Sequence, residues 1–528
     1  MKLIKQLKLT SLILVIAFCA NPQITFALDV NVTSDTGTTV TNSVTLGNFT
    51  NSATITTSGP DSDGVQNSGT GTITTFTNSG TIIGVDDGIQ NDGTITSLIN
   101  SGRINGNFGV FISNIGTLTT FTNTGTVAGS TYGFFGSTTN VINSGTISGT
   151  INAIRIANSG TVNLTLNKGS VLIGDLHVNN TGTLNITSNV GASKSYAYTT
   201  AGDGTITLND LNNRPAVKGS ALAINIGSME MAGENLYQKT ANITDAVDRN
   251  VKNNKDTWVE PYYSESTRDS GGDSSQIRQF KNNKQGVNAG FKVENSATPL
   301  QVIFNVDQTK NNIDSSEHII NSDSVMIGLT APSYGKYEGF DVSVKGLVGY
   351  ANSKTDRKIL DNTSSTGERT LTGEYDSYYA VVGSALSKNY NLDKDLNANL
   401  TLGVDLTSEF RDSYSENLYF KYNSLELIQL QPRIQSEFIK TTGKDSNVFL
   451  TAGVGAREVL SGKTQKYSMN NTGVSFTTPN SGDYYASLAV GTNMNVAANV
   501  NFYTLISAKM SDRDTETYQA SIGLKGTF

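Results

Sequence analysis

The stretch NSGTIIGVDDGIQNDGTITSLINSGRINGN, residues 78–107, decides the fold because one short phrase keeps returning within it. The phrase opens with Asn-x-Gly and occurs ten times between Asn67 and Asn180. In nine of these ten occurrences, Ile, Leu or Val stands four residues after the Asn. An apolar residue repeated at one offset from a turn-forming phrase predicts a chain of similar structural units.

The repeat length identifies the architecture. The Asn-x-Gly phrases form two interleaved series, one at positions 78, 100, 123, 143 and 167 and the other at 67, 91, 114, 158 and 180. A period near 22 residues is typical of solenoids, and Leu is too sparse for leucine-rich repeats. Thr and Ile beside Gly favour strands over helices. We therefore expect a right-handed parallel β-helix of roughly seven coils.

In such a fold the repeated apolar residues stack inside the coils. We expect one interior stack of Ile82, Ile104, Val127, Ile147 and Val171, and a second of Ile95, Leu118, Val162 and Leu184. The repeated Gly is expected to turn the corners, where positive φ is needed. The repeated Asn is expected to bond to adjacent backbone and to form ladders between coils.

The N-terminus has the layout of a secretory signal. The basic MKLIKQLK precedes the apolar LTSLILVIAFCA, and ITFALDV supplies small residues for cleavage between Ala27 and Leu28. Lipidation at Cys19 is the alternative, but the bulky Phe18 precedes that Cys. Cys19 is the single Cys of the chain, so cleavage leaves none for disulfides. The net charge of -7 argues against nucleic acid as a partner.

The second half of the chain has a different pattern. Leu236, Ile243, Val247 and Val251 follow helical spacing within polar surroundings and predict one narrow amphipathic helix. After it come long strands in which apolar residues alternate with polar ones, several of them about ten residues or longer, as membrane strands require. Charges on the polar face suit a water-lined lumen, and those expected there are Asp405, Glu409, Arg411, Arg433 and Glu437.

The last stretch, TYQASIGLKGTF at 517–528, alternates in the same way and ends on Phe528. Together with the signal, the repeats, the helix and the TWVEPYY segment around Trp258, it resembles the monomeric (classical) autotransporters of type V secretion. That resemblance implies a signal peptide at 1–27, a β-helical passenger at 28–225, a linker helix at 226–254 inside the barrel lumen, and a transmembrane β-barrel of about twelve strands at 255–528.

The resemblance also implies partners and sites. The barrel would lie in the outer-membrane bilayer as a monomer, with Phe528 as the signal for the barrel-assembly machinery. Some members cut themselves in the linker helix, which makes Asn253-Asn254 the candidate scissile pair, although an uncut helix end is the simpler reading. The passenger would stay at the cell surface or be released, as an adhesin or surface antigen whose host ligand the sequence does not identify.

Little in the chain indicates catalysis, and we expect no catalytic residues, cofactor or metal. The only two His are His177 and His318, and DSGGDSS at 269–275 departs from the serine-protease motif. The acidic segments DSDGVQN and VDDGIQN, which hold Asp61 and Asp86, would suit calcium, but Asp-Gly is also ordinary turn chemistry. An exported β-helix enzyme, such as a polysaccharide lyase or protease, and a porin with an unrelated N-terminal domain remain the alternatives.

Overall fold

The structure is a computed structural model that describes residues 28–526, except 158–159, 180, 219–220, 251–256, 270–277, 295, 297, 418, 444–445, 479–481 and 498. Its described residues form an all-β fold with two helices, and the chain divides into two compact units. The first unit holds the chain up to Val190 with Tyr198–Asn209 and Asp361–Gly367, and the second holds the rest.

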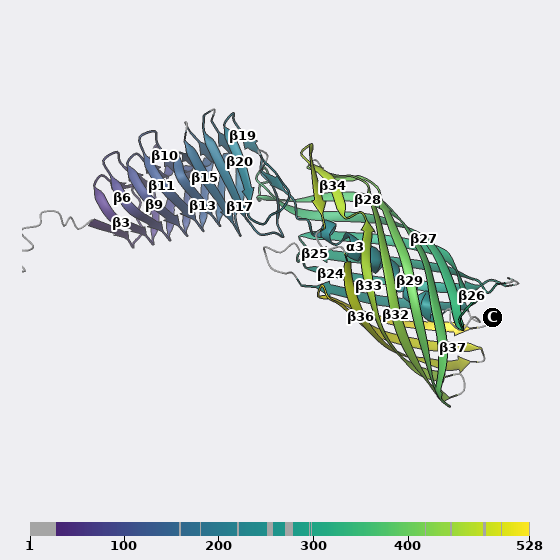
Figure 1. Ribbon diagram of the computed structural model, residues 1–528. Coiled ribbons are helices and arrows are strands. Elements are labelled where there is room, and N and C mark those ends of the chain that lie inside the picture. Colours follow the sequence, from purple (N-terminus) through teal and green to yellow (C-terminus); the bar gives the residue numbers. More distant parts are fainter. Residues whose placement is uncertain are drawn as a thin grey trace, which may run out of the picture. The chain divides into compact units, whose positions relative to one another are not determined.

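The first unit is a parallel β-solenoid of about eight coils (Figure 1). One sheet contains nine strands in the order β1 (Leu28–Val32), β3 (Thr45–Asn51), β6 (Thr72–Asn78), β9 (Thr94–Asn100), β11 (Thr117–Asn123), β13 (Thr138–Asn143), β15 (Thr161–Asn167), β17 (Thr183–Asn189) and β20 (Thr205–Asp210). Its neighbours are about one repeat apart in sequence, as the period of the Asn-x-Gly phrase predicts.

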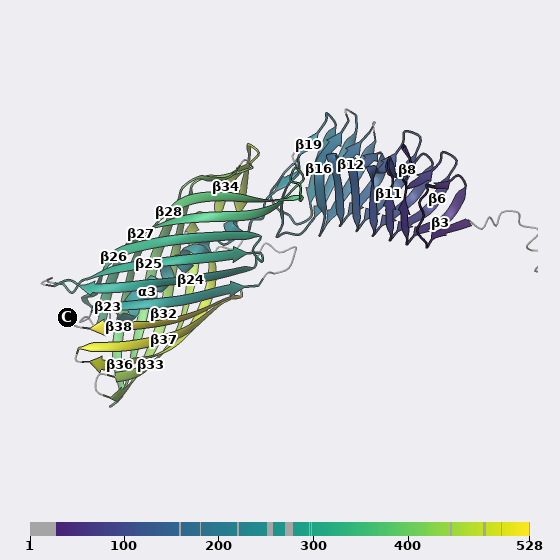
Figure 2. The same ribbon diagram turned by 180° about the vertical axis from the view of Figure 1, so that it is seen from behind.

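The second solenoid sheet has ten strands (Figure 2). Eight follow the order β19 (Thr200–Ala201), β16 (Val171–Val178), β14 (Thr146–Ile156), β12 (Thr126–Gly136), β10 (Arg103–Ile112), β8 (Asp87–Asn91), β5 (Val65–Asn67) and β2 (Val40–Asn42). The short strands β4 (Thr54–Thr56) and β7 (Thr81–Ile83) pair with each other, and β7 also pairs with β10.

The interior stacks form with one correction. Ile82, Ile104, Val127 and Ile147 follow one another in register and are fully buried. The next position is taken by Leu172 and not by Val171, which is only half-buried. The turn after Asn167 contains Gly169 at φ +93° and is one residue longer, so the inward position moves by one. In the other stack, Ile95 pairs with Leu118, and Val162 with Leu184.

The repeated Asn forms the ladders that the sequence predicts. Asn51, Asn78, Asn100, Asn123 and Asn143 are buried at the ends of successive strands, and each side-chain amide donates to the next at 2.8 Å. A second ladder joins Asn42, Asn67 and Asn91. Because a carboxamide both donates and accepts, the same residue can repeat without leaving a buried amide unpaired.

The expected role of the repeated Gly is wrong. Gly80, Gly102, Gly125 and Gly145 do not have φ in the left-handed region. A Cβ on Gly102 would lie 2.0 Å from the carbonyl oxygen of Gly80 in the neighbouring coil, and the other three are as crowded. Gly is therefore needed because successive coils approach too closely for any side chain.

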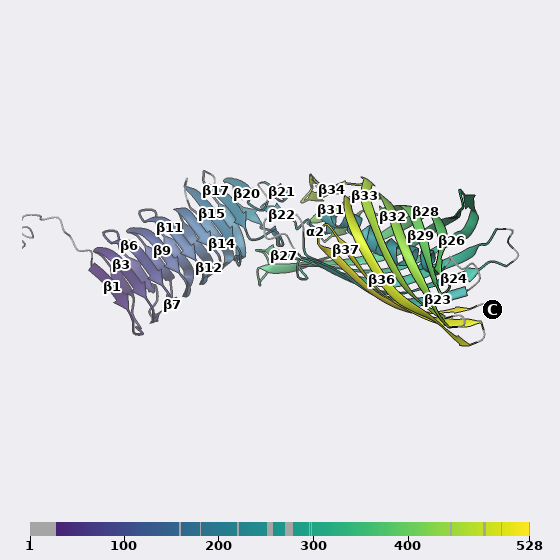
Figure 3. The same ribbon diagram turned by 60° about the horizontal axis from the view of Figure 1, so that its bottom comes forward.

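The second unit is a closed barrel of twelve antiparallel strands (Figure 3). They are β23 (Thr257–Arg268), β24 (Phe280–Lys292), β25 (Gln301–Ile313), β26 (His318–Tyr337), β27 (Phe340–Asp361), β28 (Glu368–Asp393), β29 (Leu396–Arg411), β32 (Leu425–Gly443), β33 (Ser446–Ser461), β36 (Gly482–Ala497), β37 (Val500–Ser511) and β38 (Thr515–Gly526). The first strand pairs with the last, so no edge is left open.

Alternation gives the barrel two different faces. On β38, Tyr518, Ile522 and Leu524 are 48–54% exposed, whereas Gln519, Ser521 and Lys525 are 4–7% exposed. The outer face is rich in Val, Ile, Leu and aromatic side chains, and the inner face carries amides and charges. This is the reverse of a soluble sandwich, whose interior would be apolar.

Several short elements cover one end of the barrel. The strands β30 (Tyr414–Glu416), β31 (Phe420–Tyr422), β34 (Thr464–Met469) and β35 (Thr472–Thr477) form a four-stranded sheet. The strands β18 (Ser195–Ala197), β21 (Ala216–Val217) and β22 (Leu222–Ala223) extend the barrel sheet from β27. Their side chains share one apolar cluster with helix α2 (Gly227–Glu230), which leads into α3 (Ala232–Asn250).

Candidate functional site: a helix inside the barrel lumen

Helix α3 lies inside the barrel (Figures 1 and 2). Its apolar stripe, Leu236, Ile243 and Val247, is at most 2% exposed and packs on inward apolar side chains of the wall such as Ile303 and Leu347. Val251, the fourth residue of the expected stripe, lies outside the described residues. None of the described helices has the length and hydropathy needed to cross a bilayer.

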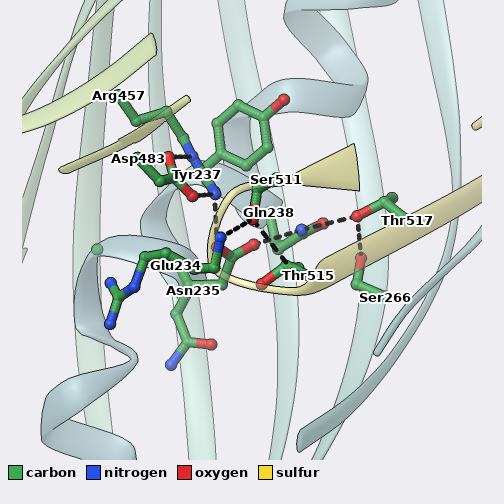
Figure 4. Close-up of polar contacts among 12 residues, drawn as sticks. Glu234, Asn235, Tyr237, Gln238, Ser266, Arg457, Asp483, Ser511, Thr515 and Thr517 are labelled. Atoms are coloured by element: carbon green, nitrogen blue, oxygen red, sulfur yellow. Dashed lines mark hydrogen bonds and ion pairs between the residues drawn. The ribbon is translucent and has the colours of Figure 1, made fainter. Parts of the chain in front are cut away.

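The N-terminal part of α3 is tied to the wall by a buried charge cluster (Figure 4). Glu234 accepts from the guanidinium of Arg457 at 2.7 Å, and Arg457 also pairs with Asp483. The Arg457 guanidinium lies 4.3 Å from the centre of the Tyr237 ring, one turn further along the helix. A planar guanidinium has several N–H donors for the two carboxylates and a flat face for the aromatic ring.

The C-terminal part of α3 is held by a second cluster. Asp248 accepts from Lys345 at 2.9 Å and pairs with Arg433. Both cations also contact Asp405 on β29, at 3.2 Å and 2.7 Å. Two cations and two carboxylates thus balance each other, which is what a buried ionic network requires to be tolerated.

The helix runs the length of the first barrel strand. Glu230, just before α3, pairs with Arg268 at the end of β23. At the other end, Arg249 and Asn250 donate to Glu260 near the start of β23, at 2.6 and 3.0 Å. Nineteen helical residues rise about 28 Å, close to the thickness of a membrane's hydrocarbon core.

Polar contacts also fill the middle of the lumen. Lys284 on β24 donates to the backbone carbonyls of Gln238 and Lys239, and Lys239 donates to the hydroxyl of Tyr379. Small cavities of about 20 and 30 Å³ lie beside the N-terminal half of the helix. A larger polar cavity of about 310 Å³ lies beside the Asp248 end of the helix. The helix therefore closes the lumen over most of its length.

The structure places the expected lumen residues as follows. Asp405 and Arg433 meet in the cluster around Asp248. Glu409 accepts hydrogen bonds from Ser377 and Tyr379, and Arg411 donates to Gln465. Glu437 lines the cavity of about 310 Å³.

The other expected sites lie partly in the described residues and partly outside them. Leu28 begins β1, whereas Ala27, Asn253, Asn254 and Phe528 lie outside the described residues. His177 contacts the amide oxygen of Asn179 at the half-buried solenoid surface. His318 is buried in the barrel beside Thr355.

Sequence reasoning missed Glu230, Glu234 and Lys345. Glu230 and Glu234 each meet an arginine of the wall, and Lys345 completes the cluster at Asp248. A signal was present in each case. Glu230 and Glu234 have the four-residue spacing of helical neighbours, and Lys345 is a charged residue on the polar side of the alternation in FDVSVKGLVGY.

Comparison with known proteins identifies the family to which the barrel belongs. Residues 257–505 match the family model described as the autotransporter β-domain. No curated protein matches the chain. Among solved structures, the translocator domain of autotransporter NalP from Neisseria meningitidis is similar, with 14% identity, coverage of 58% of this chain and 100% of that one, and a TM-score of 0.43.

Two further autotransporter structures are similar at 10% identity. The transport unit of AIDA-I from Escherichia coli covers 52% of this chain and 90% of its own, with a TM-score of 0.37. The β-domain of the Bordetella autotransporter BrkA covers 52% and 99%, with a TM-score of 0.36.

The family match spans most of the twelve-strand barrel, from the start of β23 into β37. Such barrels are embedded in the outer membrane, in keeping with the apolar outer face and polar lumen described above. The chain is therefore a type V autotransporter with a C-terminal β-barrel domain.

Proposed function

We propose that the barrel carries the solenoid to the cell surface and anchors it there. The observation that supports this is α3, which occupies the lumen immediately before the first barrel strand. Because α3 passes through the lumen and is followed by the barrel strands, the lumen offers a path across the membrane for the solenoid, which is N-terminal to the helix. Water and polar side chains in the lumen make that route compatible with a hydrophilic passenger.

Surface exposure is tested on intact cells. An epitope is inserted in the exposed turn at Asp61 of the full chain, and cells are labelled with an antibody that cannot cross the outer membrane. Strong labelling is expected before permeabilisation. A matched epitope in a periplasmic protein serves as the control. Labelling that appears only after permeabilisation would contradict the proposal.

We further propose that the displayed solenoid is an adhesin and has no catalytic role. Four half-buried rings on the outer side of β10 and β12 support this, and we call them the aromatic face: Phe108, Phe111, Tyr132 and Phe135. Their ring centres are 5.1–5.4 Å apart, and the guanidinium of Arg155 lies over Tyr132 and Phe135. Rings left at a surface commonly mark a contact site.

The aromatic face suits carbohydrate. The C–H faces of sugar rings pack on aromatic rings, while Arg155, with Gln90 opposite Phe111 and His177 opposite Arg155, provides hydrogen-bonding groups for hydroxyls. This solenoid would bind by stacking on a rigid surface and not by closing around its ligand.

Binding is tested by applying cells that display the full chain to a glycan array. Tyr132→Ser and Phe135→Ser together should reduce binding at least about tenfold, which corresponds to ~1.4 kcal/mol. Ile151→Ser, which removes a 55%-exposed apolar side chain outside the aromatic face, is the matched control. Absence of glycan binding by the wild type, or equal binding by the double variant, would contradict a role of the aromatic face.

A further inference from the structure

Three carboxylates converge in the solenoid. Asp63, Asp86 and Asp87 each place a carboxylate oxygen within 4.8 Å of the others. Asp63 and Asp87 are only 5% and 3% exposed. Among the residues that the structure describes, no lysine, arginine or histidine forms an ion pair with any of the three. Buried carboxylates without a cation are costly unless something neutralises them.

Hydrogen bonds satisfy only part of this cluster. The backbone N–H of Asp87 donates to Oδ1 of Asp63 at 3.2 Å, and the backbone N–H of Phe108 donates to the carboxylate of Asp87. The Oδ1 atom of Asp87 has no hydrogen-bond partner although it is fully buried. This unpartnered oxygen, on a side chain that is 97% buried, belongs to the set of three and is independent evidence for a missing ligand.

We propose that Asp63, Asp86 and Asp87 form a binding site for a divalent cation of the calcium type. The donor set consists of carboxylate oxygens, which hard cations prefer, and it contains no imidazole or thiolate for zinc. Calcium tolerates irregular oxygen cages, whereas magnesium requires near-octahedral geometry and retains its water. The site goes beyond surface display, and it does not depend on which ligand the aromatic face binds.

Protonation is the competing way to neutralise the cluster. Burial raises the pKa of Asp63 to about 6 and the pKa of Asp87 to about 8, with further increases from the neighbouring carboxylates of Asp86 and Asp92. Cation binding and protonation are therefore alternative ways to neutralise these carboxylates. The position of the site also links it to the aromatic face, because Phe108 lies opposite Asp87 in the sheet.

The test is isothermal titration of CaCl₂ into the full chain in detergent, at a pH near 8. One site is expected with a Kd of roughly 10⁻⁴ to 10⁻³ M, the range of extracellular calcium modules. Asp87→Asn keeps the shape and removes the charge, and it should weaken binding at least about tenfold. Asp61→Asn is the matched control, since Asp61 is exposed and Asn tolerates its φ of +53°.

Three results would overturn the site. The first is no binding of Ca²⁺ by the wild type near pH 8. The second is equal affinity in Asp87→Asn while both proteins keep heat-modifiable barrels. The third is higher thermal stability of Asp87→Asn than of the wild type in chelator and in saturating CaCl₂ alike, which would assign the cluster to a shared proton. Loss of calcium binding with unchanged antibody labelling of intact cells would support the site independently of the display proposal.

Discussion

Arg433 on strand β32 forms a buried ion pair with Asp248 of helix α3, and this contact joins the barrel wall to the segment inside it. The pair belongs to a four-member network in which Lys345 and Asp405 supply the remaining partners. Because each charge is balanced by the opposite sign, the network is neutral as a whole. Removing one member leaves an uncompensated charge among largely buried side chains.

Asp248→Asn should therefore destabilise the barrel. Loss of one partner from a buried ion pair costs about 3–5 kcal/mol. The temperature at which the full chain loses its compact electrophoretic form should fall clearly. Lys463→Gln breaks the exposed pair with Glu458 and should leave that temperature unchanged, because exposed pairs contribute little. Equal behaviour of the two variants would mean that the helix does not depend on this network.

Gly102→Ala should disrupt the solenoid at the contact between two coils. The new methyl group would lie 2.0 Å from the Gly80 carbonyl oxygen, so the coils must separate, at a cost of about 1–3 kcal/mol or more. Gly37→Ala is the control, because a Cβ there would be 4.0 Å from the nearest atom. Pulse proteolysis of the full chain in urea measures both. A solenoid that tolerates both changes equally would show that coil spacing is not the reason for Gly.

Asn100→Ala should weaken the amide ladder from both sides. Asn100 accepts from Asn78 and donates to Asn123, each at 2.8 Å, so both partners lose a hydrogen bond inside the solenoid. Leaving a buried polar group unpaired costs about 1–3 kcal/mol. Thr96→Ala removes an exposed hydroxyl from the same strand and should change little. The urea midpoint of the proteolysis-resistant solenoid should therefore fall for Asn100→Ala alone.

The solenoid should lose stability with rising pH when calcium is removed. The folded-state pKa of Asp87, about 8, and that of Asp63, about 6, both exceed the ordinary value of 3.8. Between pH ~4 and ~8 the folded state therefore binds more protons than the unfolded chain, and the free energy of unfolding falls as pH rises. Saturating CaCl₂ should oppose this fall, and Asp87→Asn should remove the part near pH 8. A urea midpoint independent of pH in chelator would contradict the raised values.

The periodic parts of the fold are predictable because one physical rule repeats in them. Ile82, Ile104 and Val127 follow a fixed offset from the Asn-x-Gly phrase, and the barrel strands alternate over lengths that are typical of membrane barrels. The offset fails at Val171, where a longer turn moves Leu172 inward. A pattern that counts a fixed number of residues from the Asn cannot detect a single inserted residue, so it predicts the wrong inward residue there.

Contacts between distant segments are harder to predict. The sheet of β30, β31, β34 and β35 reads as loop sequence, because its strands have three to six residues and gain their apolar cluster only from α2 and the ends of the barrel strands. The three carboxylates come from two coils, Asp63 from one and Asp86 with Asp87 from the next. Sequence reasoning found both acidic turns, but their burial and the unpartnered Oδ1 of Asp87 depend on how the coils stack.

The occupied lumen is tested most directly by single-channel recording in planar bilayers. The intact chain should conduct poorly, because α3 fills the lumen and only small cavities of about 20 and 30 Å³ lie beside its N-terminal half. Deletion of 227–250, which removes both helices and keeps all twelve barrel strands, should open a large and steady conductance. A large steady conductance from the intact chain, unchanged by the deletion, would contradict a helix in the lumen.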